Sequence, residues 1–187
     1  MEFLGLDLPS YGWETVLGSA ISGVFLGSIY ALVALGLTLI YGVLHIINFA
    51  HGALLMLAMY AVFFLWKFLG LDPYLAMIIV VPGAYVFGYG LQRGIIGKAS
   101  HGRDEIILLV TLGVSIVIEN AALFFFSASE RSVLVPYDLD GIDLGVTYAV
   151  YPELIALGGS LLITFALWLF MSLTDTGKAI RAVAKER

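Results

Sequence analysis

The chain has 187 residues, of which 61% are hydrophobic and 12% are charged, whereas soluble domains are about 25% charged. Residues Thr15 to Trp66 include no charged side chain, so a water-soluble globular domain is excluded and most of the chain is expected to lie in lipid. The net charge of −5 without a basic stripe argues against a nucleic-acid partner. The absence of cysteine excludes disulfides and thiolate metal sites.

Five apolar segments are long enough to cross a membrane as helices. The N-terminal segment up to Glu14 carries acidic but no basic residues, so it does not match the positive start of a secretory signal, and the first span should stay in the mature chain. We predict an all-α polytopic membrane helix bundle. The predicted spans are Thr15 to Leu44, Ala50 to Trp66, Pro73 to Ile96, Glu105 to Ser127 and Pro152 to Leu173.

The first span is too long for one upright crossing. Its thirty residues extend about 45 Å as a helix, against about 30 Å of hydrocarbon, so it must tilt, protrude or break. Small residues recur at every fourth position, which favours close packing against another helix of this chain or of a partner subunit. These residues are Ser19, Gly23, Gly27 and Ala31.

The segment from Gly36 to Gly52 places three polar side chains between two apolar spans. These are His45, Asn48 and His51. Polar groups at membrane depth are costly and tend to face a cavity or one another, so we consider Asn48 and His51 candidates for a substrate path. The alternative is that the two histidines cap helix ends at the lipid surface.

The fourth span contains a carboxyl group deep in the membrane. Glu119 lies 14 residues after Glu105, which is about 21 Å along a helix. At the centre of a helix an Asp costs about 3 kcal/mol on insertion scales. Because Thr111, Ser115 and Glu119 follow at four-residue intervals, we expect a polar stripe facing an interior, with Asn120 beside it. It could line a transport path, hold a proton-linked carboxyl, or form an interhelical hydrogen bond with neutral Glu119.

The distribution of basic residues predicts the orientation. Arg93, Lys98 and Arg103 lie between the third and fourth spans, and the fifth span is followed by four further basic residues. These segments should be cytoplasmic, and the acidic loop from Ala128 to Tyr151 should lie outside together with the N-terminus. Within that loop, residues 132–148 predict a short β-hairpin that turns at Asp140-Gly141. It is either a simple connector or a docking surface for an external protein.

The C-terminal stretch from Thr174 to Arg187 combines a modest apolar face with basic residues. It predicts a short amphipathic helix beside the membrane, or alternatively the basic flank of the last span. The chain has no HExxH or GxSxG motif, and Ala99 stands where a P-loop needs Ser or Thr. We therefore expect a chain that is not an enzyme, with no catalytic residues, no metal site and no cofactor of its own.

Three motifs resemble a known family in order and spacing over nearly the whole chain. They are GLTLIYGVLHIINFAHGALLMLAMY from Gly36, GVSIVIEN from Gly113 and GKAIRAVAKER from Gly177. They are similar to the permease subunit of branched-chain amino acid ABC importers of the LivH type. In that family the matching positions are Asn48 and His51 of the first motif, a polar pair at Glu119 and Asn120, and a cytoplasmic coupling segment. The candidate coupling residues are Gly177, Lys178 and Arg181.

The resemblance implies partners and a location. These are a second permease subunit, two cytoplasmic subunits that bind ATP and Mg²⁺ and drive the coupling segment, an external solute-binding protein, and the cytoplasmic membrane of a bacterium or archaeon. Family members continue into further spans, so we expect residues 1–187 to form a single transmembrane permease domain that is incomplete at its C-terminus, as a fragment, a truncated product or half of a split permease. The alternatives are an ABC permease for urea, amides or another small polar solute, and a proton-coupled carrier that uses Glu119.

Overall fold

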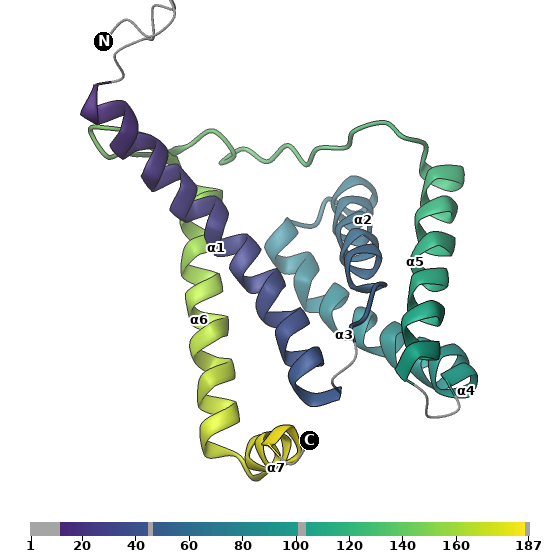
Figure 1. The fold of residues 1–187 in the computed structure, drawn as a ribbon. Coiled ribbons are helices and arrows are strands. Elements are labelled where there is room, and N and C mark those ends of the chain that lie inside the picture. The colour runs from purple at the N-terminus through teal and green to yellow at the C-terminus, as the bar shows by residue number, and fades with distance from the viewer. Residues whose placement is uncertain (1–11, 45–46, 101–103, 186–187) are drawn as a thin grey trace, which may run out of the picture. The chain divides into compact units, whose positions relative to one another are not determined.

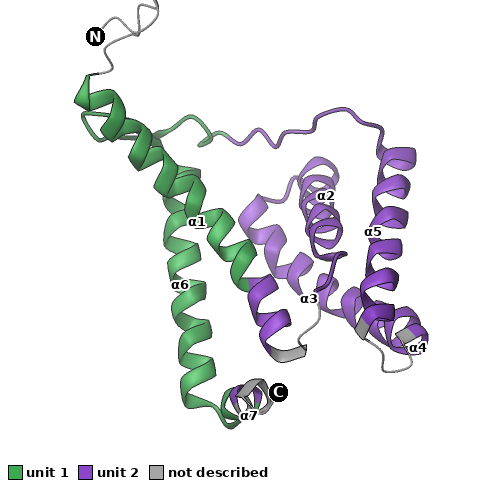
Figure 2. Cartoon of the chain, in the orientation of Figure 1, with its two compact units in different colours: residues 1–35, 136–179 green, residues 36–135, 180–187 purple. Residues whose placement is uncertain are grey.

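The structure, a computed structural model, describes residues 12–44, 47–100 and 104–185. His45 and Arg103 lie outside the described residues. The chain divides into two compact units (Figure 2): unit 1 comprises residues 1–35 and 136–179, and unit 2 comprises residues 36–135 and 180–187. The expectation of a single transmembrane domain stays a prediction.

Five helices in the described part of the chain are long and apolar enough to cross a membrane, which confirms the predicted helix bundle. Figure 1 labels these helices, together with the short α7 (Asp175–Lys185) that follows the last of them. They are α1 (Trp13–Leu44), α2 (His51–Leu69), α3 (Pro73–Leu91), α5 (Asp104–Phe126) and α6 (Tyr151–Leu173). The predicted ends differ by a few residues, and α1 is continuous over 32 residues, so the first span does not break.

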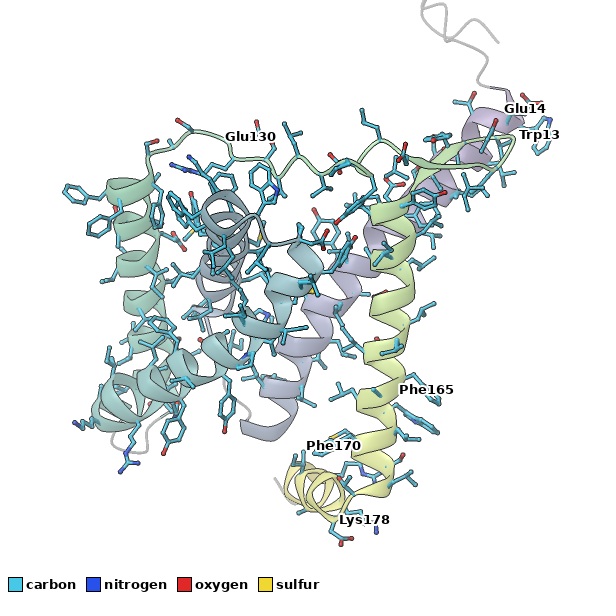
Figure 3. The ribbon with its side chains drawn as sticks, turned by 180° about the vertical axis from the view of Figure 1, so that it is seen from behind. Trp13, Glu14, Glu130, Phe165, Phe170 and Lys178 are labelled. Carbon is cyan, nitrogen blue, oxygen red and sulfur yellow. The ribbon has the colours of Figure 1, made fainter. Side chains whose placement is uncertain are left out.

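Large apolar side chains cover the surfaces of these helices. Trp13 and Phe165 are 71% and 61% exposed, and Phe170 is also exposed; all three are labelled in Figure 3. In water such surfaces would cause association, whereas a bilayer or neighbouring apolar helices cover them without cost. The exposure pattern therefore agrees with a membrane protein.

The third span contains an irregular turn. Its start follows the sequence signals, because the Asp72 side chain caps the helix by accepting the Tyr74 N–H at 2.9 Å and Pro73 occupies the first helical position. At its other end the α-helix becomes a π-helix, η1 (Gln92–Ile96), followed by α4 (Gly97–Ser100). The span thus continues beyond the predicted end at Ile96, through a wider turn.

In unit 2, α2 contacts both α3 and α5. The ring of Phe126, at the end of α5, lies 4.7 Å from that of Tyr60 and 4.9 Å from that of Phe64 on α2. At the other end, the residues just before α2 contact the first third of α5. α2 and α5 therefore run in the same direction. α5 is the most buried span: in its most apolar stretch 22% of the residues are buried, against 6% in each of the other four.

Unit 1 contains the predicted hairpin, with a different turn. β1 (Gly141–Asp143) pairs antiparallel with β2 (Tyr148–Val150). The predicted turn at Asp140-Gly141 is wrong, because Gly141 lies within β1 opposite Val150 and the chain reverses at residues 144–147. The reason is that Gly145 adopts a left-handed φ of 80° and donates its N–H to Asp143 Oδ1 at 2.8 Å.

The hairpin turn contacts α1 within unit 1. The carbonyl oxygen of Val146 lies 2.8 Å from where a Cβ on Gly18 would be, so only glycine permits this approach. The contact places the hairpin beside the first turns of α1. This proximity agrees with the prediction that the loop from Ala128 to Tyr151 and the N-terminus lie on the same side of the membrane. Gly23 and Gly27 belong to the small residues of α1 that were predicted to pack against another helix. A Cβ added to either would meet no other described residue within 4 Å, so the described part of the chain does not supply that helix.

Candidate functional site

The candidate path residues begin at the turn between α1 and α2. The side chain of Asn48 accepts the N–H of Ala50 at 3.0 Å, and its carbonyl accepts the N–H of His51 at 3.2 Å. Asparagine commonly forms such local turns because its amide oxygen imitates a backbone carbonyl. The side chain of Asn48 thereby starts α2.

A second contact joins this turn to α5. The N–H of Phe49 donates to Thr111 Oγ1 at 3.3 Å, and the same hydroxyl donates to the carbonyl of Leu108 at 3.1 Å. Thr111 is 1% exposed and lies seven residues after the start of α5, about 10 Å along the helix. The turn is therefore bonded to a buried side chain of α5, although the side chains of Ile47 and Phe49 are themselves exposed.

His51 provides an unsatisfied polar atom beside this turn. Its imidazole lies next to Gly36 of α1, where an added Cβ would be 3.5 Å from Cε1. The Nε2 atom is buried and has no hydrogen-bond partner among the described residues. Because nearly all buried polar atoms in proteins are bonded, an unpaired ring nitrogen is a group that a solute or a water molecule can satisfy.

The predicted polar stripe on α5 is only partly buried. Ser115 is 6% exposed and donates to Glu119 Oε1 at 2.8 Å. Glu119 and Asn120 are exposed, and the amide of Asn120 donates to the carbonyl of Ile116 at 2.7 Å. The expectation that the stripe faces an interior is wrong for Glu119 within the described chain. A four-residue step exceeds one turn of 3.6 residues, so the stripe rotates by about 40° at each step.

In unit 2 the turn at Asn48 and His51 is thus bonded to Thr111 of α5 through the N–H of Phe49. Ser115 lies one turn further along α5 and is bonded to Glu119. Among the described residues no cluster of three His, Cys, Asp or Glu could hold a metal ion. These candidate residues offer hydroxyl, amide, imidazole and carboxylate atoms. Their chemistry is that of polar contacts in an apolar bundle, which suits solute passage.

The candidate coupling residues lie at a sharp corner between α6 and α7. Thr174 caps α7: its hydroxyl accepts the N–H of Gly177 at 3.0 Å and donates to the carbonyl of Phe170 at 2.7 Å. A Cβ on Gly177 would lie 2.6 Å from the Cα and the carbonyl oxygen of Met171. Glycine is therefore required where α7 turns back against α6. The sequence analysis named Thr174 only as the start of the C-terminal stretch and not as a cap, although a threonine directly before a helical segment is a typical helix start.

The basic candidates on α7 are exposed. Lys178 Nζ lies 3.1 Å from Asp175 Oδ1, and the two side chains are 59% and 99% exposed. Arg181 is exposed on the same helix. An exposed ion pair of this kind contributes little to stability.

The family described as "Branched-chain amino acid transport system / permease component" matches residues 19–187. The high-affinity branched-chain amino acid transport system permease protein BraD of Pseudomonas aeruginosa is 30% identical over 178 residues, which cover 89% of this chain and 58% of BraD. The permease protein LivH of the corresponding Salmonella typhimurium system is 28% identical over 183 residues, which cover 88% of this chain and 58% of LivH. LivH of Escherichia coli is 32% identical over 132 residues, covering 64% of this chain and 41% of LivH.

The chain thus spans a little over half the length of the first two of these relatives. No solved structure matches it significantly.

Proposed function

Because this chain belongs to the family of permease components of branched-chain amino acid transport systems, we propose that it forms part of the membrane path of an ATP-binding cassette importer for these amino acids. The observation that carries the proposal is the family match over residues 19–187, together with the printed function of BraD and LivH. The five apolar spans give the membrane location that a permease needs. The same match favours this function over a proton-coupled carrier that uses Glu119.

The proposed system has several components. A second permease subunit completes the path, two cytoplasmic subunits bind ATP and Mg²⁺ and hydrolyse the nucleotide, and an external protein delivers the solute. The membrane is the cytoplasmic membrane of a bacterium or archaeon, and the N-terminus lies outside. Arg93 of η1 and Lys98 of α4 follow α3, and these basic residues support this orientation by the positive-inside rule.

Within this function we assign two regions. The turn at Asn48 and His51, with Thr111 and Ser115 of α5, lines the path, since the unpaired Nε2 of His51 is a polar contact for a passing solute. α7 receives the movement of the ATP-binding subunits through Gly177, Lys178 and Arg181. The corner before α7 supports this role, because the two hydrogen bonds of Thr174 connect α6 to α7 rigidly. A displacement of α7 would therefore move the end of α6 as well.

The test is uptake by the full-length chain reconstituted with its partner subunits in vesicles. We expect leucine uptake that requires both ATP inside the vesicles and the external binding protein. Uptake that follows the proton gradient without ATP contradicts the proposal, and so does transport of urea or amides with no transport of leucine, isoleucine or valine. Replacing His51 with Asn serves as a site test, with a lower uptake rate expected at unchanged assembly.

A further inference from the structure

A second polar region of unit 2 lies at the opposite end of α2 and α5 from the Asn48 turn. There side chains of α2, of α3 and of the segment after α5 line an open pocket of about 530 Å³. Figure 3 labels Glu130 on this segment. We call this space the Arg131 pocket; its walls include Met56, Met59, Met77, Phe63, Glu130 and Arg131.

Arg131 is held by aromatic rings. The guanidinium carbon lies 5.4 Å from the ring centroid of Phe63, 5.7 Å from that of Phe64 and 6.0 Å from that of Phe126. One terminal nitrogen donates to the carbonyl of Phe126 at 2.6 Å. These contacts fix the cation in place, since aromatic faces attract a guanidinium group most strongly where water is excluded.

The hydrogen bonds of Arg131 are incomplete. Its Nε atom is buried and has no partner, and among the described residues no carboxylate forms an ion pair with it. A guanidinium has five N–H donors arranged to bind a carboxylate through two parallel bonds. A fixed, partly desolvated cation with unused donors is therefore suited to an anionic ligand group.

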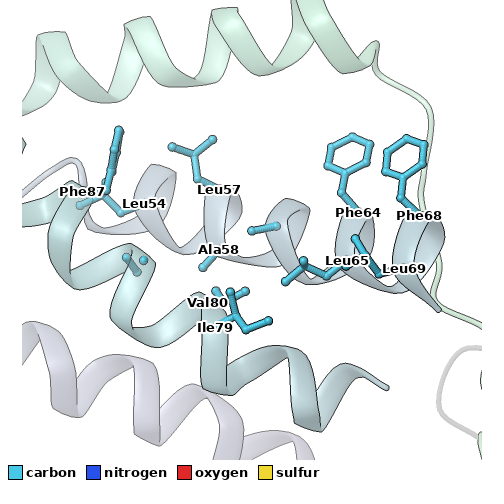
Figure 4. Close-up of a pocket in the computed structure, with 13 residues that line it drawn as sticks. Leu54, Leu57, Ala58, Phe64, Leu65, Phe68, Leu69, Ile79, Val80 and Phe87 are labelled. Atoms are coloured by element: carbon cyan, nitrogen blue, oxygen red, sulfur yellow. The ribbon is translucent and has the colours of Figure 1, made fainter. Parts of the chain in front are cut away.

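The rest of the pocket defines the other parts of that ligand. Three methionines and Phe63 form an apolar wall, and methionine adapts to aliphatic groups of different shape. Glu130, next to Arg131 in the chain, lines the same pocket and supplies a negative charge. By contrast, the pocket of about 580 Å³ between α2 and α3 (Figure 4) is lined by apolar residues such as Leu57, Phe64 and Ile79, and holds no group that could orient a charged molecule.

We propose that the Arg131 pocket binds a free α-amino acid with an aliphatic side chain: Arg131 holds its carboxylate, Glu130 holds its ammonium group, and the methionines and Phe63 contact its side chain. This inference rests on the proposed function and adds to it a binding site at the other end of the path from Asn48. The volume is within the range of small-molecule sites. The shared chemistry of an anionic head and an apolar tail also fits a lipid headgroup, which the experiment must distinguish.

The experiment measures equilibrium binding of radiolabelled leucine to the full-length chain in phosphatidylcholine nanodiscs. Arg131→Lys keeps the positive charge but loses the two-bond geometry, and we expect at least tenfold weaker leucine binding. Glu130→Gln, at an exposed position, should weaken leucine binding by a similar factor. The matched control is Lys67→Gln, because Lys67 lies 5.8 Å from the Phe63 ring and does not line the pocket, so leucine affinity should be unchanged.

Analogues separate the two charged contacts. 4-Methylpentanoate, which has no ammonium group, should respond to Arg131→Lys and not to Glu130→Gln. Equal leucine affinity in all variants overturns the inference and leaves Arg131 as an anchor that fixes the loop. Loss of leucine binding when phosphatidylglycerol replaces half of the lipid also overturns it, since the pocket then prefers a lipid headgroup.

Failure of this binding site can be distinguished from failure of the proposed function. If the assembled transporter carries leucine with the same KM in the wild type and in both pocket variants, the binding site is wrong and the permease function stands. If the assembled transporter carries no branched-chain amino acid, the proposed function itself fails, whatever the nanodisc measurement shows.

Discussion

The turn before α2 and the corner before α7 each connect a long apolar helix to the next helix, and different contacts hold them. At the first, the N–H of Phe49 is bonded to Thr111, 62 positions further along the chain. At the second, the bonds of Thr174 reach Phe170 and Gly177, no more than four positions away. The turn therefore depends on the packing of α5 in unit 2, whereas the corner is encoded in a few consecutive residues.

This difference predicts how far the effect of a substitution extends through the structure. A change at the turn should lower the stability of unit 2 as a whole, because the contact spans two helices. A change at the corner should displace α7 and disturb coupling without unfolding the spans. Four variants test this contrast and are given in order of decreasing effect.

Gly177→Ala should have the largest effect. The new Cβ would lie 2.6 Å from backbone atoms of Met171, and overpacking of this kind costs about 3 kcal/mol at the upper end of its usual range. We expect α7 to shift and leucine uptake to fall at least tenfold in the assembled transporter, while the chain still inserts into the membrane. Gly158→Ala on α6 is the matched control, because an added Cβ meets nothing within 4 Å there. Wild-type uptake in Gly177→Ala contradicts the model of a tight corner.

Thr111→Val should have the second-largest effect. It keeps the shape of the buried side chain but removes the acceptor of the Phe49 N–H, and an unsatisfied buried donor costs about 2 kcal/mol. Thermal unfolding in detergent should show lower stability of the whole of unit 2. Thr111→Ser keeps the hydroxyl and should restore most of the loss. Equal stability of the Val and Ser variants would mean that the bond to Phe49 contributes nothing.

Thr174→Val should have a smaller effect on stability, and that effect should be confined to α7. Loss of a helix N-cap costs about 1 kcal/mol, and here it also removes the bond to the Phe170 carbonyl. Hydrogen exchange should become faster in α7 and stay unchanged in α2 and α5. Thr174→Ser is the control and should exchange as the wild type does. Faster hydrogen exchange in α5 would show that the contacts of the corner also stabilise helices outside it.

The double charge reversal Lys178→Glu and Arg181→Glu should have the smallest effect on stability, within about 0.5 kcal/mol for exposed positions. We expect the ATP-binding subunits to co-purify in reduced amount, while membrane insertion is unchanged. Normal co-purification contradicts a coupling role for these charges. Asp175→Asn, which removes only the partner of Lys178, should leave both measurements unchanged.

The candidate site shows how far sequence reasoning reached. Asn48 and Thr111, which the sequence placed in separate motifs, are joined in the structure through the residue after Asn48, because the N–H of Phe49 donates to Thr111. Their role in a substrate path stays a prediction. Glu119 was expected to face the same interior, yet it is exposed, since the direction of a side chain two turns further along a helix depends on small rotations. Arg131 was not a candidate site residue, and no sequence pattern indicated its aromatic neighbours on α2 and α5.

The membrane class, the five spans and the family could be read from the sequence alone, because lengths of apolar runs and short motifs are local properties of the chain. Tertiary packing was needed to show that the turn before α2 is bonded to α5, that the hairpin reverses after Asp143, and that Arg131 lies among three rings. Each of these depends on contacts or backbone angles set when distant segments pack, and no periodicity along the chain records them.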